Sequence, residues 1–322
     1  MAETTQIVPI VGVQAGHGRV RFLLSAIGGL ASRARLSNNS MRAYMCHRAH
    51  QVFNGTCMFF GKLELTEVAW GDSPRRARLG GQGKLLVLLH GQMQSHAAWH
   101  AIAPDLARTH TVLCPDLPRD LDFRRQAEEL LRLASDLGHE HLAVAGHGTG
   151  GHIAAYAAWL APERVTHLAE IECIPSPGHQ GRADLAFELS RYSSCWFAQL
   201  HPKPESATMA VPEEWTRPAP HSVAPFSRSA VADYLETMPA GETPGANGHH
   251  RIPPYPGDLR IACPLLVVWS RDGRLGGWYN PADLWRPYAT GPLNQAEIAC
   301  GYYIPEEQPQ ALLDALTAFL AS

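Results

Sequence analysis

The chain of 322 residues exceeds one typical domain, but a single α/β domain with an insertion reaches this size. Apolar residues make up 45% and charged residues 18%, which allows a large core and excludes a mainly disordered chain. The net charge of −3, without a long basic run, argues against nucleic acid as the main partner.

The seven cysteines are odd in number, scattered, and without a Cys-x-x-Cys pair. This pattern predicts reduced, buried thiols in a cytoplasmic protein. The longest uncharged apolar stretch, 22–31, is about half of the ~20 residues that a membrane helix needs, so we expect no membrane partner. With Arg19 and Arg21 before it, this stretch has some features of a secretion signal, but the segment that precedes it is too long and apolar for one.

Residues 1–57 do not fit the pattern that follows them. They hold a second apolar patch at 7–13 and a piece rich in Arg, Ser and Asn at 32–42. An extension, a targeting arm and an upstream stretch translated from a wrongly chosen start all remain open.

From residue 58 to 175, short apolar segments alternate with segments of helical periodicity, which predicts a parallel sheet with helices on both faces. In chain order we predict a strand at 63–68, a polar loop at 71–83, a buried strand at 84–89, a helix at 99–106, a strand at 111–114, a helix at 123–137, a strand at 141–145, a helix through 153–160 and a strand at 167–171.

The regular alternation stops at residue 176. Residues 176–258 are rich in Pro, His, Ser and Gly, with helical pieces near 185–200 and 230–238, and predict a cap inserted between two strands. In the second part of the core, 259–322, we predict a strand at 263–269, a helix at 281–288, a strand at 295–299 and a helix at 306–320.

A glycine-dense turn, Gly146-His-Gly-Thr-Gly-Gly151, joins the strand at 141–145 to its helix. Strand, sharp turn and helix are the setting of a nucleophile elbow, in which flanking glycines let a strained backbone expose one side chain. The central position expects Ser, Cys or Asp and holds Gly148, which has no side chain that could attack a substrate.

These features together resemble the α/β-hydrolase superfamily, in particular its haloacetate dehalogenase and epoxide hydrolase branch. The segments that carry the resemblance are Leu-His-Gly-Gln (89–92), Pro-Asp-Leu (115–117), Gly-His-x-x-Gly-Gly (146–151), Ala-Pro-Glu-Arg-Val-Thr-His-Leu (161–168), Ile-Ala-Cys-Pro-Leu-Leu-Val-Val-Trp (261–269) and Ile-Pro-Glu-Glu (304–307). The resemblance covers residues 60–320 and implies an α/β-hydrolase fold, with a mostly parallel sheet, helices on both faces and an inserted helical cap.

The resemblance also assigns the catalytic positions. The nucleophilic Asp of the family falls on Gly148, and the Arg that follows it in the haloacetate branch falls on Thr149. The water-activating His falls on Tyr302, and Glu172 falls where a third carboxylate can stand. In the family, the His at the position of His147 is mainly a packing and hydrogen-bonding residue of this turn. A catalytic role is the alternative hypothesis for His147.

The backbone donors of the predicted site do not depend on side chains. In this fold the oxyanion hole uses the N–H group of the residue after the nucleophile, here Thr149, and one beside the His-Gly turn, here Gln92 or Met93. Tyr302 can donate a hydrogen bond but is a poor base near neutrality, and Glu172 is its plausible carboxylate partner. We expect the pocket walls to include aromatic side chains of the cap and of the last loop: Trp196, Phe197 and Tyr303.

The sequence gives only weak indications of a metal or cofactor site. His96 and His100 have the i, i+4 spacing of metal ligands, but no third ligand is evident, so we expect neither metal nor cofactor. The partner we expect is a small-molecule substrate or ligand, and the oligomeric state cannot be read from the sequence.

Three functions remain open. The first is a non-hydrolytic enzyme (lyase, isomerase or cyclase) that acts on an apolar metabolite through the oxyanion hole. The second is a catalytically inactive binding or scaffold protein. The third is a hydrolase of epoxides, esters or haloacids that uses another water-activating pair, such as Glu172 with His147.

Overall fold

The computed structural model describes residues 59–71, 73–118, 121–175, 226–237 and 255–322. All of them belong to one compact unit, Cys57–Ser322. The N-terminal segment 1–57, the helical piece at 185–200 and the aromatic residues Trp196 and Phe197 lie outside the described residues.

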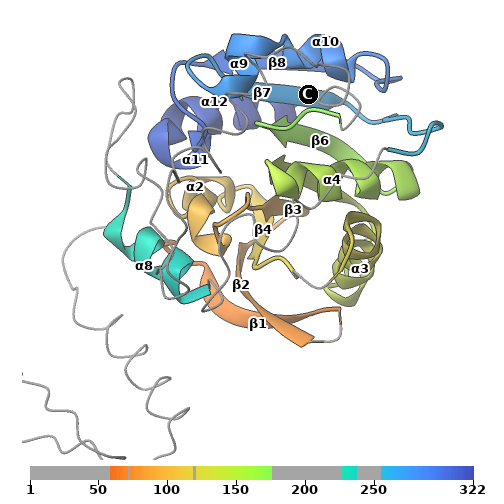
Figure 1. Ribbon diagram of the computed structural model, residues 1–322. Coiled ribbons are helices and arrows are strands. Elements are labelled where there is room, and N and C mark those ends of the chain that lie inside the picture. Colours follow the sequence, from red (N-terminus) through yellow and green to blue (C-terminus); the bar gives the residue numbers. More distant parts are fainter. Residues whose placement is uncertain (1–58, 72, 119–120, 176–225, 238–254) are drawn as a thin grey trace, which may run out of the picture. The chain divides into compact units, whose positions relative to one another are not determined.

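The described part is built on one sheet of eight strands in the order β1-β2-β4-β3-β5-β6-β7-β8 (Figure 1). The strands are β1 (Glu64–Trp70), β2 (Ser73–Gly81), β3 (Lys84–Leu89), β4 (His110–Pro115), β5 (Leu142–His147), β6 (Val165–Ile171), β7 (Leu265–Ser270) and β8 (Leu293–Ile298). From β4 to β8 all neighbours are parallel, whereas β2 pairs antiparallel with both β1 and β4. The predicted α/β class with a mostly parallel sheet is therefore confirmed.

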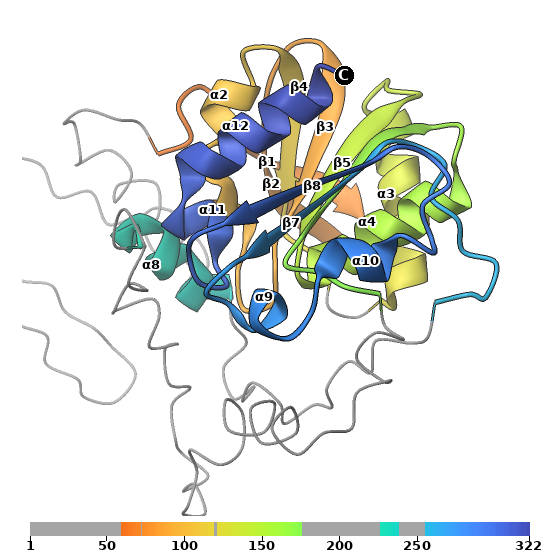
Figure 2. The ribbon, with the colours of Figure 1, turned by 90° about the horizontal axis from the view of Figure 1, so that it is seen from above.

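Helices cover both faces of this sheet. They are η1 (His96–Trp99), α2 (Ala103–Leu106), α3 (Phe123–Asp136), α4 (Thr149–Leu160), α8 (Arg228–Thr237), α9 (Arg274–Trp278), α10 (Pro281–Trp285), α11 (Ile304–Glu307) and α12 (Pro309–Leu320). Figure 2 shows α2, α11 and α12 on one face and α3, α4 and α10 on the other. In the described part of the chain, no helix is long and apolar enough to cross a membrane.

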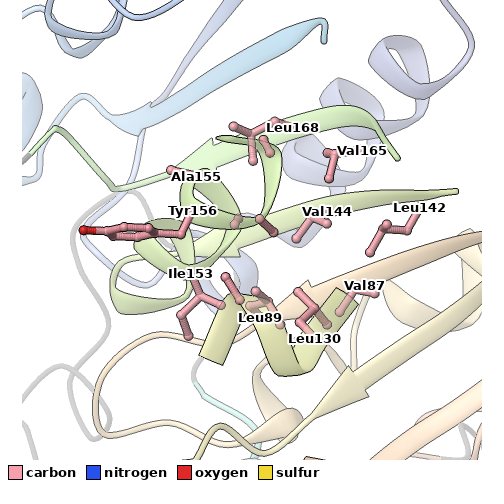
Figure 3. Packing of buried hydrophobic residues seen from close by; sticks show 14 of the residues in the cluster. Val87, Leu89, Leu130, Leu142, Val144, Ile153, Ala155, Tyr156, Val165 and Leu168 are labelled. Atoms are coloured by element: carbon pink, nitrogen blue, oxygen red, sulfur yellow. The ribbon is translucent and has the colours of Figure 1, made fainter. Parts of the chain in front are cut away.

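The two faces bury separate apolar clusters, because successive side chains of a strand point to opposite sides. In β3, Val87 and Leu89 join the cluster under α3 and α4, and Leu86 and Leu88 join the cluster under α2 and α12. Figure 3 shows the first cluster, in which Leu130 of α3 and Ile153 of α4 lie over the strands. A strand buried on both faces reads as a continuous apolar run, which is why β3 and β5 could be predicted.

The predicted polar loop at 71–83 is wrong, because Ser73–Gly81 forms strand β2. Ala77 is its one fully buried side chain, so this strand lacks the apolar alternation that marks a strand. The pairing with β1 on one side and β4 on the other holds β2 through its backbone instead. A strand that is held by backbone pairing is therefore difficult to predict from the pattern of its side chains.

The predicted helix at 306–320 is divided in the structure. Ile304–Glu307 forms α11 and Pro309–Leu320 forms α12, with Gln308 between them at φ −138° and ψ 58°. Pro309 fits the start of a helix, since it lacks an N–H group and the first turn needs none. The helix predicted at 230–238 is confirmed as α8, and the four described cysteines are free and buried, as predicted.

Candidate active site

The turn after β5 has the geometry of a nucleophile elbow. Gly148 lies between β5 and α4 with φ 52° and ψ −113°, a backbone conformation that residues other than glycine rarely adopt. Gly146 is also required, because a Cβ atom there would overlap the backbone of Gly150. The elbow is therefore a close-packed backbone turn that places Gly148 at the start of a 12-residue helix.

The space in front of Gly148 is filled by Tyr302. A Cβ atom built on Gly148 would overlap the hydroxyl oxygen of Tyr302 and would lie 3.4 Å from its Cζ atom. The phenol group thus stands where the first atom of a side chain at the elbow would be. Two positions that the sequence singled out separately, 154 residues apart, meet here.

The loop that carries Tyr302 is tied down on both sides. The carboxylate of Glu307 accepts hydrogen bonds from the N–H groups of Gly301 (2.8 Å) and Tyr303 (3.0 Å). The carbonyl oxygen of Tyr302 accepts a hydrogen bond of 2.8 Å from Nε2 of His147. The backbone on which the phenol stands is therefore fixed at three consecutive residues.

His147 is an internal link of the site. Its ring is completely buried, Nε2 donates to the Tyr302 carbonyl, and Nδ1 lies 3.1 Å from the side-chain oxygen of Gln94. Burial lowers its pKa to about 4, against the hydrogen bond to Tyr302 and with a further decrease from His90. The imidazole is therefore neutral at pH 7, and protein groups surround both of its nitrogens.

Glu172 follows β6, the neighbour of β5. The Gly148 N–H group donates to the carbonyl oxygen of Ile171 (2.8 Å), so the elbow lies directly beside Glu172. The Glu172 carboxylate accepts a hydrogen bond from the N–H group of Ser270. Burial raises the pKa of Glu172 to about 7, the charge of Glu307 raises it further, and the hydrogen bonds from Ser270 oppose this. Near neutrality this carboxyl group can both give and take a proton.

The backbone around the elbow is strained. Three non-glycine residues of the described part have positive φ, and two of them, Met93 (63°) and Glu172 (49°), lie in the connections that follow β3 and β6, the strands that flank β5. Such conformations cost about 1–3 kcal/mol each and cluster at functional sites. The strain supports a site here, independently of any side chain that the resemblance assigns.

The predicted backbone donors lie at the same edge of the sheet. Thr149 is the first residue of α4, and Gln92 and Met93 follow β3, which pairs with β5. Thr149 and Met93 are partly buried, and Gln92 is exposed. The positive end of the α4 dipole favours an anion or a developing negative charge at this edge.

Tyr303 is one of the predicted pocket residues. Its ring packs edge-to-face on Phe226 (5.3 Å between centroids) and on Tyr302 (5.0 Å), and it is buried. Glu307 and Gln94 were not identified as site residues from the sequence. Nothing in the sequence marked Glu307 as a site residue, because its partners are the backbone N–H groups of Gly301 and Tyr303, and every residue except proline carries such a group.

The predicted histidine pair, His96 and His100, does not form a metal site by itself. The structure brings His96 together with Asp116 and Asp233, three possible ligands whose donor atoms lie within 4.8 Å of one another. The guanidinium group of Arg76 already contacts both carboxylates, at 3.1 Å from Asp116 and 3.2 Å from Asp233. This cluster therefore has its own cation and ties helix α8 to the sheet.

Comparison with known proteins extends over most of the chain. The family profile described as "Alpha/beta hydrolase family" matches residues 86–315. A soluble epoxide hydrolase from Corynebacterium sp. (strain C12) is 26% identical over 279 residues, which cover 75% of this chain and 91% of the relative. A fluoroacetate dehalogenase from Burkholderia sp is 29% identical over 308 residues, which cover 82% and 95%. A solved structure of a candidate alpha/beta hydrolase from Nostoc sp PCC 7120 is similar with a TM-score of 0.68 and 28% identity, over 80% of this chain and 98% of that one.

Proposed function

We propose that this chain, which belongs to the alpha/beta hydrolase family, is a non-hydrolytic enzyme of the lyase, isomerase or cyclase type. Its substrate would be an apolar small metabolite with a carbonyl group. The observation that carries the proposal is the Tyr302 hydroxyl group in the space of a side chain at Gly148. A phenol in this place gives the site a hydrogen-bond donor where a hydrolase of this fold has a nucleophile.

Covalent hydrolysis requires an attacking side chain at the elbow, and glycine has none. The same elbow still offers the N–H group of Thr149 at the helix N-terminus, and the Tyr302 hydroxyl group lies against Gly148, the residue before it. In the proposal both groups donate to one carbonyl oxygen of the substrate and stabilise an enolate or alkoxide, which is the charge that lyase and isomerase reactions develop.

Glu172 is the proton acceptor in this proposal. A general base works best when its pKa is close to the working pH, and burial brings the pKa of Glu172 to about 7. Removal of a proton next to the polarised carbonyl of the substrate would give the enolate that Thr149 and Tyr302 stabilise. The proton then returns from Glu172 to the product, so no net acid or base is consumed.

The charge of the site favours an uncharged substrate. The resemblance assigns the Arg position of the haloacetate branch to Thr149, which is uncharged, and His147 is neutral because burial lowers its pKa to about 4. Glu172 and Glu307 add negative charge when they are ionised. A carboxylate substrate such as a haloacetate would therefore meet no cation among these residues.

Proton exchange in heavy water tests the proposal without knowledge of the product. Uncharged ketones, esters and thioesters with apolar chains are incubated with the protein in D2O, and loss of the proton signal next to the carbonyl is followed by NMR. We expect exchange with the natural chain, loss of exchange in Tyr302→Phe and Glu172→Gln, and retention in the control Tyr288→Phe, whose ring packs on Trp285 in the other apolar cluster. Exchange that persists in Tyr302→Phe, or no exchange with any compound, would contradict the proposal.

A binding protein without catalysis is the second candidate. The observation that favours it is that protein groups already engage both His147 nitrogens and the Glu172 carboxylate. Retention of a compound in equilibrium dialysis, without exchange of its protons, would select this candidate. Hydrolysis by Glu172 with His147 ranks lower, because a base with a pKa of about 4 is a weak acceptor at pH 7.

A further inference from the structure

The phenol at the elbow needs a fixed support, since it stands on a loop and not on a helix or strand. Tyr302 belongs to the short connection between β8 and α11. Loops are more mobile than the elements that they connect, and a donor misplaced by 1 Å loses much of its effect. Some part of the chain must therefore hold the hydroxyl group against Gly148.

Glu307, at the end of α11, has the required contacts. One carboxylate oxygen accepts the N–H group of Gly301 at 2.8 Å, and the other accepts the N–H group of Tyr303 at 3.0 Å. These two residues are the direct neighbours of Tyr302 in the chain. The two bonds therefore hold the backbone of the loop on both sides of the phenol.

The backbone of Glu307 binds the same loop. The carbonyl oxygen of Tyr303 accepts the N–H group of Glu307 at 2.9 Å, so backbone and side chain of Glu307 contact the same short segment. Glu307 is 1% exposed, which keeps water from competing for the two N–H groups. The carbonyl oxygen of Tyr302 is held from another side, by Nε2 of His147.

We propose that Glu307 is the positioning residue that holds the Tyr302 hydroxyl group against Gly148. This assignment rests on the proposed function, because it gives Glu307 a role only if the phenol acts at the elbow. Glu307 does not touch the substrate. It acts through the loop, and its loss frees the phenol while leaving Tyr302 in the chain.

A double-mutant cycle between Gly148→Ala and Glu307→Gln measures this coupling without any substrate. Gly148→Ala lowers the melting temperature in two ways, through strain at positive φ and through overlap of the new Cβ with the Tyr302 hydroxyl. The strain is the same in both backgrounds, so the cycle cancels it. If Glu307 fixes the phenol, the overlap is relieved in Glu307→Gln, and the loss caused by Gly148→Ala is smaller there by about 2–4 °C.

Glu306→Gln is the matched control. Glu306 is the preceding residue, is equally buried, and accepts its hydrogen bond from the Tyr234 hydroxyl group, away from the loop. Burial raises the pKa of Glu306 to about 8, so glutamine replaces a protonated acid of the same shape. The loss caused by Gly148→Ala should be unchanged in this background.

A spectroscopic signal completes the test and also serves if Glu307→Gln folds poorly. With tyrosine labelled by ¹³C at Cζ, the Tyr302 resonance is identified by its absence in Tyr302→Phe. We expect it to shift or broaden in Glu307→Gln and in the shorter Glu307→Asp, and to stay in place in Glu306→Gln. Equal losses in all backgrounds, or an unmoved Tyr302 resonance, would overturn the role of Glu307. Neither readout depends on turnover, so failure of the proposed function leaves this test interpretable.

Discussion

The variant Glu172→Gln tests the environment of the carboxyl group beside the elbow. Burial raises the pKa of Glu172 from 4.5 to about 7, and the charge of Glu307 adds to this, against the hydrogen bonds from Ser270. The folded state therefore keeps a proton that the unfolded chain releases. The contribution of Glu172 to the free energy of unfolding is therefore fully present below about pH 4.5, where the side chain is protonated in both states, and is lost as the pH rises through 7.

The size of the effect follows from the difference between the two pKa values. About 2.5 pKa units at about 1.4 kcal/mol per unit give about 3 kcal/mol between pH 4.5 and pH 8. The side chain is 4% exposed, so solvent screening reduces this value little. Glutamine has the same shape, stays uncharged, and keeps an oxygen that accepts the hydrogen bond from Ser270.

Urea unfolding at pH 5, 6, 7 and 8 measures the difference directly. We expect the free energy of unfolding of Glu172→Gln to rise relative to the natural chain by about 2–3 kcal/mol across this range. Glu163→Gln, a change at an exposed glutamate, is the control and should follow the natural chain. If the Glu172→Gln difference is the same at every pH, the carboxyl group titrates normally and cannot be the base that we propose.

Three further changes probe other parts of the chain. Glu170→Met should raise the unfolding free energy at pH 7 by about 1–3 kcal/mol in urea, because burial raises the pKa of this carboxyl group well above its usual value and its partner, the thiol of Cys173, is a weak hydrogen-bonding group. A chain that starts at Met58 should keep a single cooperative melt, and insoluble material would contradict the prediction that residues 1–57 are dispensable for folding. The natural chain should not hydrolyse aryl esters or small epoxides, whereas the double variant Gly148→Asp with Tyr302→His should gain weak hydrolysis and a covalent label on Asp by mass spectrometry. A folded double variant that stays unlabelled would contradict the idea that only two side chains separate this site from a hydrolase.

The sequence predicted the fold well where burial dictates composition. The strands at 84–89 and 141–145 are apolar without interruption because helices cover both of their faces, and the structure confirms them as β3 and β5. Strand β2 was missed because its order comes from backbone pairing on both edges. The resemblance to the α/β-hydrolase superfamily is confirmed by the family match over residues 86–315.

The resemblance to the family singled out Gly148 and Tyr302 as positions of the candidate site, but it could not give their arrangement. The structure places the phenol in the side-chain space of the glycine. The role of Glu307 was invisible because its partners are backbone groups, which every residue carries. The meeting of His96 with Asp233, 137 residues later in the chain, likewise depends on how α8 folds back on the sheet.

The contact between Gly148 and Tyr302 joins the two positions to which the resemblance assigns the nucleophile and the water-activating His. A side chain at position 148 would overlap the phenol, so Tyr302 is compatible with glycine at the elbow and with little else. Glycine at position 148, in turn, leaves a space beside the N-terminus of α4. The Tyr302 hydroxyl oxygen occupies this space, where the positive end of the helix dipole is favourable for it. This fit, together with the hydrogen bonds of Glu307 to the loop, supports the proposal that a phenol donor acts at the elbow.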